Sequence, residues 1–258
     1  MGSLDELIAI VDRLRGADGC PWDRAQTFAT LRPYVLEEAY ELAEAIDRDD
    51  PDALRKELGD VLFQVALLSR IASEAGLFGI DDVARGIADK MIRRHPHVFD
   101  PTHARSAADQ GIAAWEARKA KERAGTAESS ALDGVPDALP ALLRAHRVSE
   151  KASTVGFDWP DTASVRAKVT EELSELDEAI ASGDPDAIGE ELGDLLFALV
   201  NLGRHLPVGA EDALRTATRK FEGRFRRVED RLRAEGRSVH DAGLDALEAH
   251  WQAAKREV

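Results

Sequence analysis

The chain has one cysteine among 258 residues, few aromatic residues and no long uncharged apolar run. A single cysteine cannot form an intrachain disulfide, which fits a reducing compartment. No apolar stretch approaches the roughly 20 residues of a membrane-spanning helix, so no membrane span is expected. The first six residues carry neither a signal peptide nor a myristoylation motif. Together these features predict a cytoplasmic protein.

Positive charge is also scarce, because 34 Lys and Arg residues stand against 49 Asp and Glu residues, for a net charge of -15. Binding to DNA or RNA needs a basic face, so no nucleic-acid partner is expected. The sequence also lacks a P-loop and any glycine-rich phosphate fingerprint. A chain this acidic would need metal ions and individual side chains to bind a phosphate-bearing molecule.

What the sequence has in abundance is Ala, Leu, Glu and Arg, without β-branched runs, and this composition predicts an all-α fold. Asp50-Pro51 and Asp184-Pro185 each place a capping Asp before a Pro at the first position of an expected helix. The helix after Pro51 is expected to bury an apolar stripe with three- and four-residue spacing. The stripe consists of Leu54, Leu58, Val61, Leu62, Val65 and Leu68.

Two glycines fall inside these expected helices, Gly59 in the first and Gly193 in the second. A glycine in a helix interior costs about 1 kcal/mol relative to alanine. That cost predicts the close approach of another element, such as a neighbouring helix.

The chain is a tandem repeat. A shift of 134 residues places 37–68 on 171–202 without a gap, and 18 of the 32 positions are identical. The matches continue with Lys90, Arg94, Trp115 and Lys119, which correspond to Lys220, Arg224, Trp251 and Lys255. The period is too long for a solenoid and predicts two domains. We expect a first unit at 1–120, a polar, turn-rich linker at 121–136 and a second unit at 137–258.

Each unit carries two acidic segments at helical spacing, and antiparallel packing of the two helices would bring their carboxylates together. The residues are Glu38, Glu41, Glu57 and Asp60 in the first unit and Glu172, Glu175, Glu191 and Asp194 in the second. No Lys or Arg follows any of them at three or four residues, so the like charges repel one another along the helix. A divalent cation would relieve that repulsion, and oxygen-only ligands favour Mg²⁺ or Mn²⁺ over zinc.

Two other interpretations of these acids are weighed beside the metal site. A solvated acidic face is the ordinary role of helical glutamates. A ferritin-like di-iron centre needs Glu-x-x-His pairs, and none of the seven histidines stands three residues after a Glu.

Basic and aromatic residues recur in both units. Lys90 and Arg94, like Lys220 and Arg224, lie on expected helices, where a solvated basic face is the simplest interpretation. Cations within reach of a metal cluster, however, supply what phosphoryl chemistry requires, because metal and cation share the phosphate charge. The two tryptophans of the repeat either stack on a base or pack in a core or dimer contact.

The order and duplication of these motifs resemble the MazG family of all-α nucleoside triphosphate pyrophosphohydrolases. The motifs are E-E-x-x-E, E-L-G-D-x-L-F, K-x-x-x-R and W-x-x-x-K, each present twice. The similarity covers nearly the whole chain, including R-R-H-P-H-V-F at 93–99 and V-G-F-D-W at 155–159. The resemblance implies two helical bundle units completed by homodimerisation. It also implies Mg²⁺- or Mn²⁺-dependent cleavage of nucleoside triphosphates between the α- and β-phosphates, giving the monophosphate and pyrophosphate.

The resemblance also implies roles by position. In the second unit the metal ligands would be Glu172, Glu175, Glu191 and Asp194, with Glu190 assisting the attacking water, Lys220, Arg224 and Lys255 on phosphates and Trp251 near the nucleotide. The first unit matches with Glu38, Glu41, Glu57 and Asp60 for metal and Lys90, Arg94, Trp115 and Lys119 for substrate.

Two departures from the family pattern make the units unequal. Lys56 stands where the second unit has Glu190, and both units have Ala, at positions 53 and 187, where two-domain family members carry a lysine. The first difference predicts that the second unit is the better catalyst. A nucleotide-sensing or regulatory binding protein and a purely structural bundle remain as alternative functions.

Overall fold

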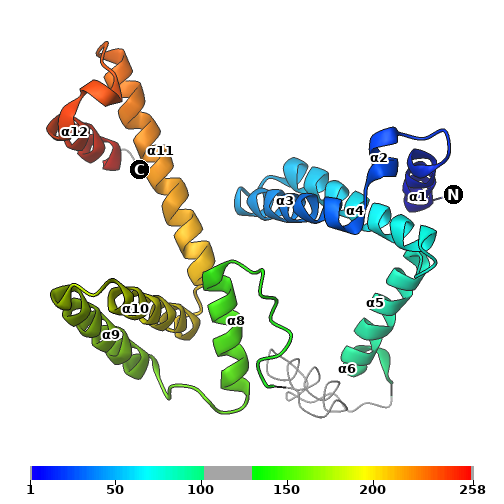
Figure 1. The fold of residues 1–258 in the computed structure, drawn as a ribbon, viewed down its shortest axis with the longest axis horizontal. Coiled ribbons are helices and arrows are strands. Elements are labelled where there is room, and N and C mark those ends of the chain that lie inside the picture. Colours follow the sequence, from blue (N-terminus) through cyan, green and yellow to red (C-terminus); the bar gives the residue numbers. More distant parts are fainter. Residues whose placement is uncertain (1, 102–129, 257–258) are drawn as a thin grey trace. The chain divides into compact units, whose positions relative to one another are not determined.

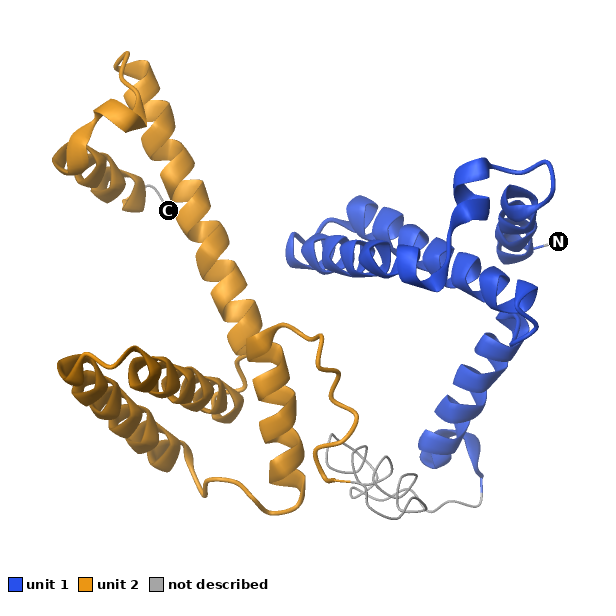
Figure 2. Ribbon diagram, in the orientation of Figure 1, with its two compact units in different colours: residues 1–109 blue, residues 110–258 orange. Residues whose placement is uncertain are grey.

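The computed structural model describes residues 2–101 and 130–256, and every regular element in those ranges is a helix (Figure 1). The chain splits into two compact units, 1–109 and 110–258 (Figure 2). The all-α prediction and the prediction of two helical units are therefore confirmed. The proposed linker at 121–136 lies partly outside the described residues, and its limits stay a prediction.

The first unit is built around a helical hairpin. Its helices are α1 (Ser3–Arg15), α2 (Pro21–Ala25), α3 (Phe28–Asp47), α4 (Pro51–Glu74), α5 (Ile80–Arg94) and α6 (Pro96–Phe99). Helices α3 and α4 form the hairpin, and α1 packs against α4. The buried core joins Val11 of α1 and Leu31 of α3 to Leu67 and Ile71 of α4.

The second unit contains a similar helical hairpin, which is followed by two more α-helices. Its helices are α8 (Ala141–Thr154), α9 (Thr162–Ser182), α10 (Pro185–His205), α11 (Ala210–Ala234) and α12 (Gly243–Lys255), with the 3₁₀ turn η2 (Val239–Asp241). Helices α9 and α10 form the hairpin, and α8 packs against α10. A separate apolar cluster holds α12 on α11 and includes Val228, Leu232 and Ala254.

The repeat in the sequence is also a repeat of helix starts. Helices α4 and α10 begin at Pro51 and Pro185, and each has an aspartate N-cap. Asp50 Oδ1 accepts hydrogen bonds from the backbone N of Asp52 at 3.0 Å and of Ala53 at 3.1 Å. Asp184 Oδ1 likewise accepts one from the backbone N of Asp186 at 3.0 Å. Both predicted helix starts are confirmed, because these carboxylates satisfy backbone donors that the first helical turn leaves free.

The expected apolar stripe of α4 is only partly buried. Leu58, Leu62 and Val65 are 51%, 42% and 37% exposed, whereas Leu67, on the other side of the helix, is fully buried. Helices α1 and α3 pack on the side of α4 that carries Leu67, so the predicted burial of these three residues is wrong within the described chain. The apolar spacing predicted this stripe, but the described helices cover the side of α4 that carries Leu67.

The two helix-interior glycines do not mark a close approach. A Cβ added at Gly59 or Gly193 would meet nothing within 4 Å, apart from the helix's own backbone. The expectation of a tightly packed neighbour at these positions is therefore wrong for the described residues. None of the helices that the structure describes has the length and apolar character needed to cross a membrane.

An ion-pair network ties the loop before α9 to the last turn of α10. Arg204 donates to Asp158 through both terminal nitrogens, and its Nη1 lies 2.8 Å from Asp158 Oδ2. His205 Nε2 lies 3.1 Å from Asp158 Oδ1. The hydrogen bonds from Arg204 hold the pKa of Asp158 well below its ordinary value, although partial burial opposes the shift. This carboxylate thus fixes the entry to the α9–α10 hairpin.

Replacing Asp158 by Asn is expected to lower the free energy of unfolding at pH 7 by about 1 kcal/mol, because the ion pair with Arg204 is lost. Since the folded-state pKa is depressed, this stabilisation is present above the unfolded pKa of roughly 3.9. It is lost as the pH falls through the folded-state pKa. Urea unfolding of wild type and variant, followed by circular dichroism, should therefore show the same difference in stability at pH 7 and 5 and a smaller difference at pH 3.

The matched control is Glu222→Gln, which removes one exposed negative charge from the same unit. It should stay within about 0.5 kcal/mol of wild type at every pH. A gap between wild type and Asp158→Asn that widens as the pH falls would contradict the proposed role of Asp158.

Candidate metal centres

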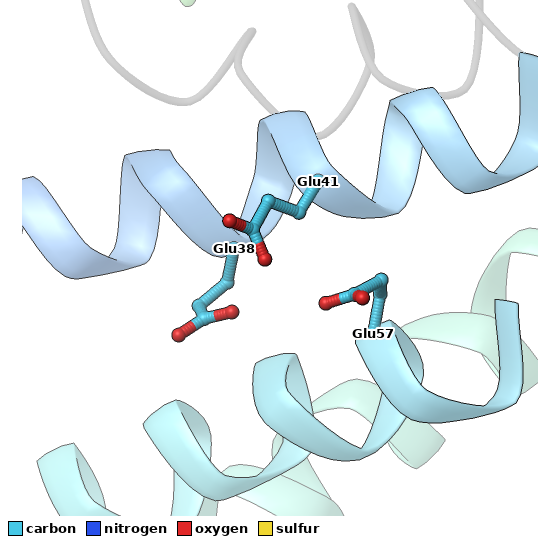
Figure 3. A group of neighbouring side chains, drawn as sticks. All are labelled: Glu38, Glu41 and Glu57. Atoms are coloured by element: carbon cyan, nitrogen blue, oxygen red, sulfur yellow. The ribbon is translucent and has the colours of Figure 1, made fainter. Parts of the chain in front are cut away.

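The hairpin of the first unit brings three glutamates together. Glu38 and Glu41 are three residues apart on α3 and share a face, and Glu57 on α4 points toward them (Figure 3). One carboxylate oxygen from each lies within 4.8 Å of the others. Glu57 is only 8% exposed, and its buried Oε2 has no hydrogen-bond partner. A buried carboxylate oxygen without a donor is costly, and a divalent cation is a partner that would satisfy it.

The hairpin of the second unit repeats the arrangement. Glu172 and Glu175 of α9 and Glu191 of α10 also offer oxygens within 4.8 Å of one another. Here the most buried acid is Glu172, at 6% exposed, and it belongs to the first helix of the hairpin rather than the second. The two units thus repeat the cluster but bury different members of it.

The electrostatics of both clusters are those of acids that crowd one another. The negative charge of Glu57 raises the pKa of Glu41, and partial desolvation and Glu38 act in the same direction. Desolvation raises the pKa of Glu175, and the charges of Glu172 and Glu191 add to the rise. Carboxylates in this arrangement are hard oxygen donors with unbalanced charge, which is the donor set that Mg²⁺ and Mn²⁺ prefer.

Each unit brings together three of its four predicted metal ligands. Asp60 and Asp194 lie outside the groups within 4.8 Å. Asp60 is half-buried on α4 and pairs with a lysine, whereas Asp194 is exposed on α10. Their assignment as metal ligands therefore stays a prediction.

A lysine contacts the most buried carboxylate of each cluster. Lys56 Nζ lies 2.9 Å from Glu57 Oε1 and 3.5 Å from Asp60 Oδ2. In the second unit, Lys168 Nζ lies 2.7 Å from Glu171 Oε1 and 2.7 Å from Glu172 Oε1. These hydrogen bonds raise the pKa of each lysine above its ordinary value, so both stay charged at neutral pH.

Lys168 is absent from the residues predicted from the sequence. Lys168 precedes Glu171 by three residues and Glu172 by four, so a pattern of cations that follow an acid does not include it. Residues three or four apart on a helix are neighbours in either direction, so the spacing itself indicates these pairs. Lys56, which precedes Asp60 by four residues, pairs with it in the same way.

The predicted phosphate-binding and base-binding residues of the second unit lie on its last two α-helices. Lys220 and Arg224 lie on α11, and Trp251 and Lys255 lie on α12. The rings of Phe221 and Trp251 are 5.1 Å apart between centroids. They line an open apolar pocket of about 330 Å³, whose other walls include Phe225, Leu244 and Leu247. In Figure 1, α12 packs on the part of α11 farthest from the α9–α10 hairpin.

The structure describes two of the four corresponding residues of the first unit. Lys90 and Arg94 are half-buried on α5, whereas the three clustered acids lie on α3 and α4. Trp115 and Lys119 lie outside the described residues. Within one unit, therefore, the described chain places the carboxylate cluster and the predicted cations on different elements.

Comparison with known proteins gives the family. The model of the MazG nucleotide pyrophosphohydrolase domain matches the chain twice, at residues 26–99 and 161–228. A nucleoside triphosphate pyrophosphohydrolase of Escherichia coli (strain K12) is 47% identical over 260 residues, covering 100% of this chain and 98% of the relative.

A second relative comes from Thermotoga maritima and is called nucleoside triphosphate pyrophosphohydrolase/pyrophosphatase MazG. It is 46% identical over 251 residues, 97% of this chain and 95% of its own length. Both family matches contain the acids of one carboxylate cluster. The chain belongs to the MazG nucleotide pyrophosphohydrolase family and carries its domain twice.

Proposed function

We propose that this chain is a metal-dependent nucleoside triphosphate pyrophosphohydrolase, which converts a nucleoside triphosphate and water to the monophosphate and pyrophosphate. The observation that carries the proposal is the repeated cluster of three glutamates on a helical hairpin. The names of two relatives that match nearly the full chain support the same activity.

The second unit has the fuller set of residues for this reaction. We assign Glu172, Glu175 and Glu191, together with Asp194, to hold Mg²⁺ or Mn²⁺. When bound, a divalent cation polarises phosphate oxygens and lowers the pKa of coordinated water. We assign Glu190, the exposed residue that precedes Glu191 on α10, to accept a proton from the attacking water.

We also propose that the active species is a homodimer. Lys220, Arg224 and Lys255 carry the charge that would stabilise departing pyrophosphate, yet they lie on α11 and α12, apart from the cluster on α9 and α10. A second chain would bring such a face over the cluster. The apolar residues that α10 leaves exposed, among them Leu192, Leu196 and Phe197, favour burial against another chain.

The purified chain, incubated with Mg²⁺ and each common nucleoside or deoxynucleoside triphosphate, should release monophosphate and pyrophosphate in equal amounts. Phosphorus NMR identifies the products, and excess EDTA should stop their formation. Release of diphosphate and orthophosphate would contradict the proposal. Thermal stabilisation by nucleotide without turnover would instead support a sensing or regulatory protein.

Glu175→Gln should lower kcat/KM by on the order of 100-fold or more, because loss of the outer-shell partners of a metal alone costs about 10- to 100-fold. Glu41→Gln, at the matching position of the first unit, should cost far less if the second unit carries turnover. Glu178→Gln is the control, because it removes an exposed acid from the same helix without touching the cluster. Equal losses for Glu175→Gln and Glu41→Gln would show that both units turn over substrate.

A further inference from the structure

The two carboxylate clusters differ in the helix that supplies their lysine. In the first unit Lys56 belongs to α4, and the equivalent residue on α10 is Glu190. In the second unit Lys168 belongs to α9, and the equivalent residue on α3 is Tyr34. Both units therefore keep the clustered glutamates, but the residues beside these glutamates differ in charge between the units.

The two lysines contact carboxylate oxygens at different positions of the repeat. Lys56 contacts Glu57 and Asp60, the two acids of α4 that are assigned to the metal. Lys168 also contacts one assigned ligand, Glu172, but its second partner, Glu171, lies outside the cluster. Each lysine thus contacts one acid of its cluster, but Lys56 pairs only with residues assigned to the metal, whereas Lys168 shares its contacts with Glu171.

The first cluster has a built place for a cation. Glu57 is more than nine-tenths buried, its Oε2 lacks a hydrogen-bond partner, and its carboxylate points toward Glu38 and Glu41 (Figure 3). Lys56 reaches Oε1 of the same carboxylate while 68% of its own side chain stays exposed. The ammonium group thus contacts the cluster from its solvent side.

We propose that Lys56 is a tethered cation that competes with a divalent metal ion for the first cluster, so that the second cluster binds metal more tightly. This inference rests on the proposed function only in treating both clusters as metal sites. The physical basis is direct, since an incoming divalent ion must either displace the ammonium group or remain next to it, and both cost binding free energy.

Direct titration of the full-length chain with Mn²⁺ tests the inference without measuring activity. Free Mn²⁺, counted by its electron paramagnetic resonance signal, should reveal two classes of site, one tight and one weak. Glu175→Gln should remove or weaken the tight class, and Glu41→Gln the weak one. A single class of equal sites would overturn the inference.

Removing Lys56 should tighten the weak class. An ammonium group a few ångströms from a divalent ion repels it even through water, so Lys56→Gln should increase affinity by on the order of tenfold or more. Lys56→Glu, which restores the residue type of the second unit, should increase it further. The reciprocal change Glu190→Lys should weaken the tight class.

Arg55→Gln is the matched control. Arg55 neighbours Lys56 but is 82% exposed and pairs with Asp52 at 3.1 Å, away from the cluster. It removes the same charge from the same helix and should change Mn²⁺ affinity by less than about twofold, since exposed charges are screened by solvent. Equal effects of Lys56→Gln and Arg55→Gln would overturn the inference in favour of a general charge effect.

The Mn²⁺ titration can support or overturn this inference independently of whether the chain has the proposed activity. Unequal Mn²⁺ classes that respond to Lys56→Gln, in a chain that releases no pyrophosphate, would support the inference and reject the proposed activity. Pyrophosphate release with no response of either class to Lys56→Gln would do the reverse. Circular dichroism of Lys56→Gln confirms that the exposed substitution leaves the helices folded.

Discussion

Mutual repulsion of carboxylates inside a helical hairpin is the constraint on which the rest of this protein depends. Each hairpin holds two glutamates of its first helix against one of its second. The charge of Glu57 raises the pKa of Glu41, and desolvation, with the charges of the neighbouring glutamates, raises the pKa of Glu175. Bringing carboxylates together in a partly buried site costs free energy unless a partner offsets their charge. Aspartate caps, short turns and apolar cores hold the hairpins closed in spite of it. A site held in this way against its own charge is prepared for a cation.

Two kinds of cation can offset the repulsion between these carboxylates. Lys56 and Lys168 each reach the most buried glutamate of their cluster, from opposite helices of the hairpin. A lysine neutralises one charge and is always present, whereas a divalent ion neutralises two and comes and goes. The two units of this family member therefore share a fold and a set of glutamates while differing in how their charge is balanced.

Local features of the sequence predicted most of the fold. Asp50-Pro51 and Asp184-Pro185 fixed two helix starts, and the 134-residue repeat anticipated two similar units, because caps and repeats act over a few residues or by direct identity. The predictions that failed needed knowledge of neighbours in space. Periodicity could not tell which apolar face of α4 the described chain covers, and an interior glycine such as Gly59 carries no information about the room around it.

The candidate site was predicted in the same uneven way. Spacing placed Glu38 with Glu41, and hairpin formation added Glu57, since helical geometry is regular. The pairing of Lys56 and Lys168 with these acids was not predicted, because each lysine precedes the acids that it contacts at helical spacing. The separation of Trp251 and its neighbouring cations from the α9–α10 cluster could not be foreseen, because no local pattern encodes how far α11 extends beyond the hairpin.

The contact between Lys56 and buried Glu57 also bears on how a duplicated site can change over successive substitutions. Gaining a lysine beside a buried acid is mild, because the acid gains a partner. Losing that lysine later leaves the carboxylate of Glu57 without its ion-pair partner, a cost that a bound metal ion would offset. The gain of the lysine is therefore tolerated more readily than its later loss. A copy that has taken it can persist as a stable hairpin after its need for metal has declined, with its glutamates still in place.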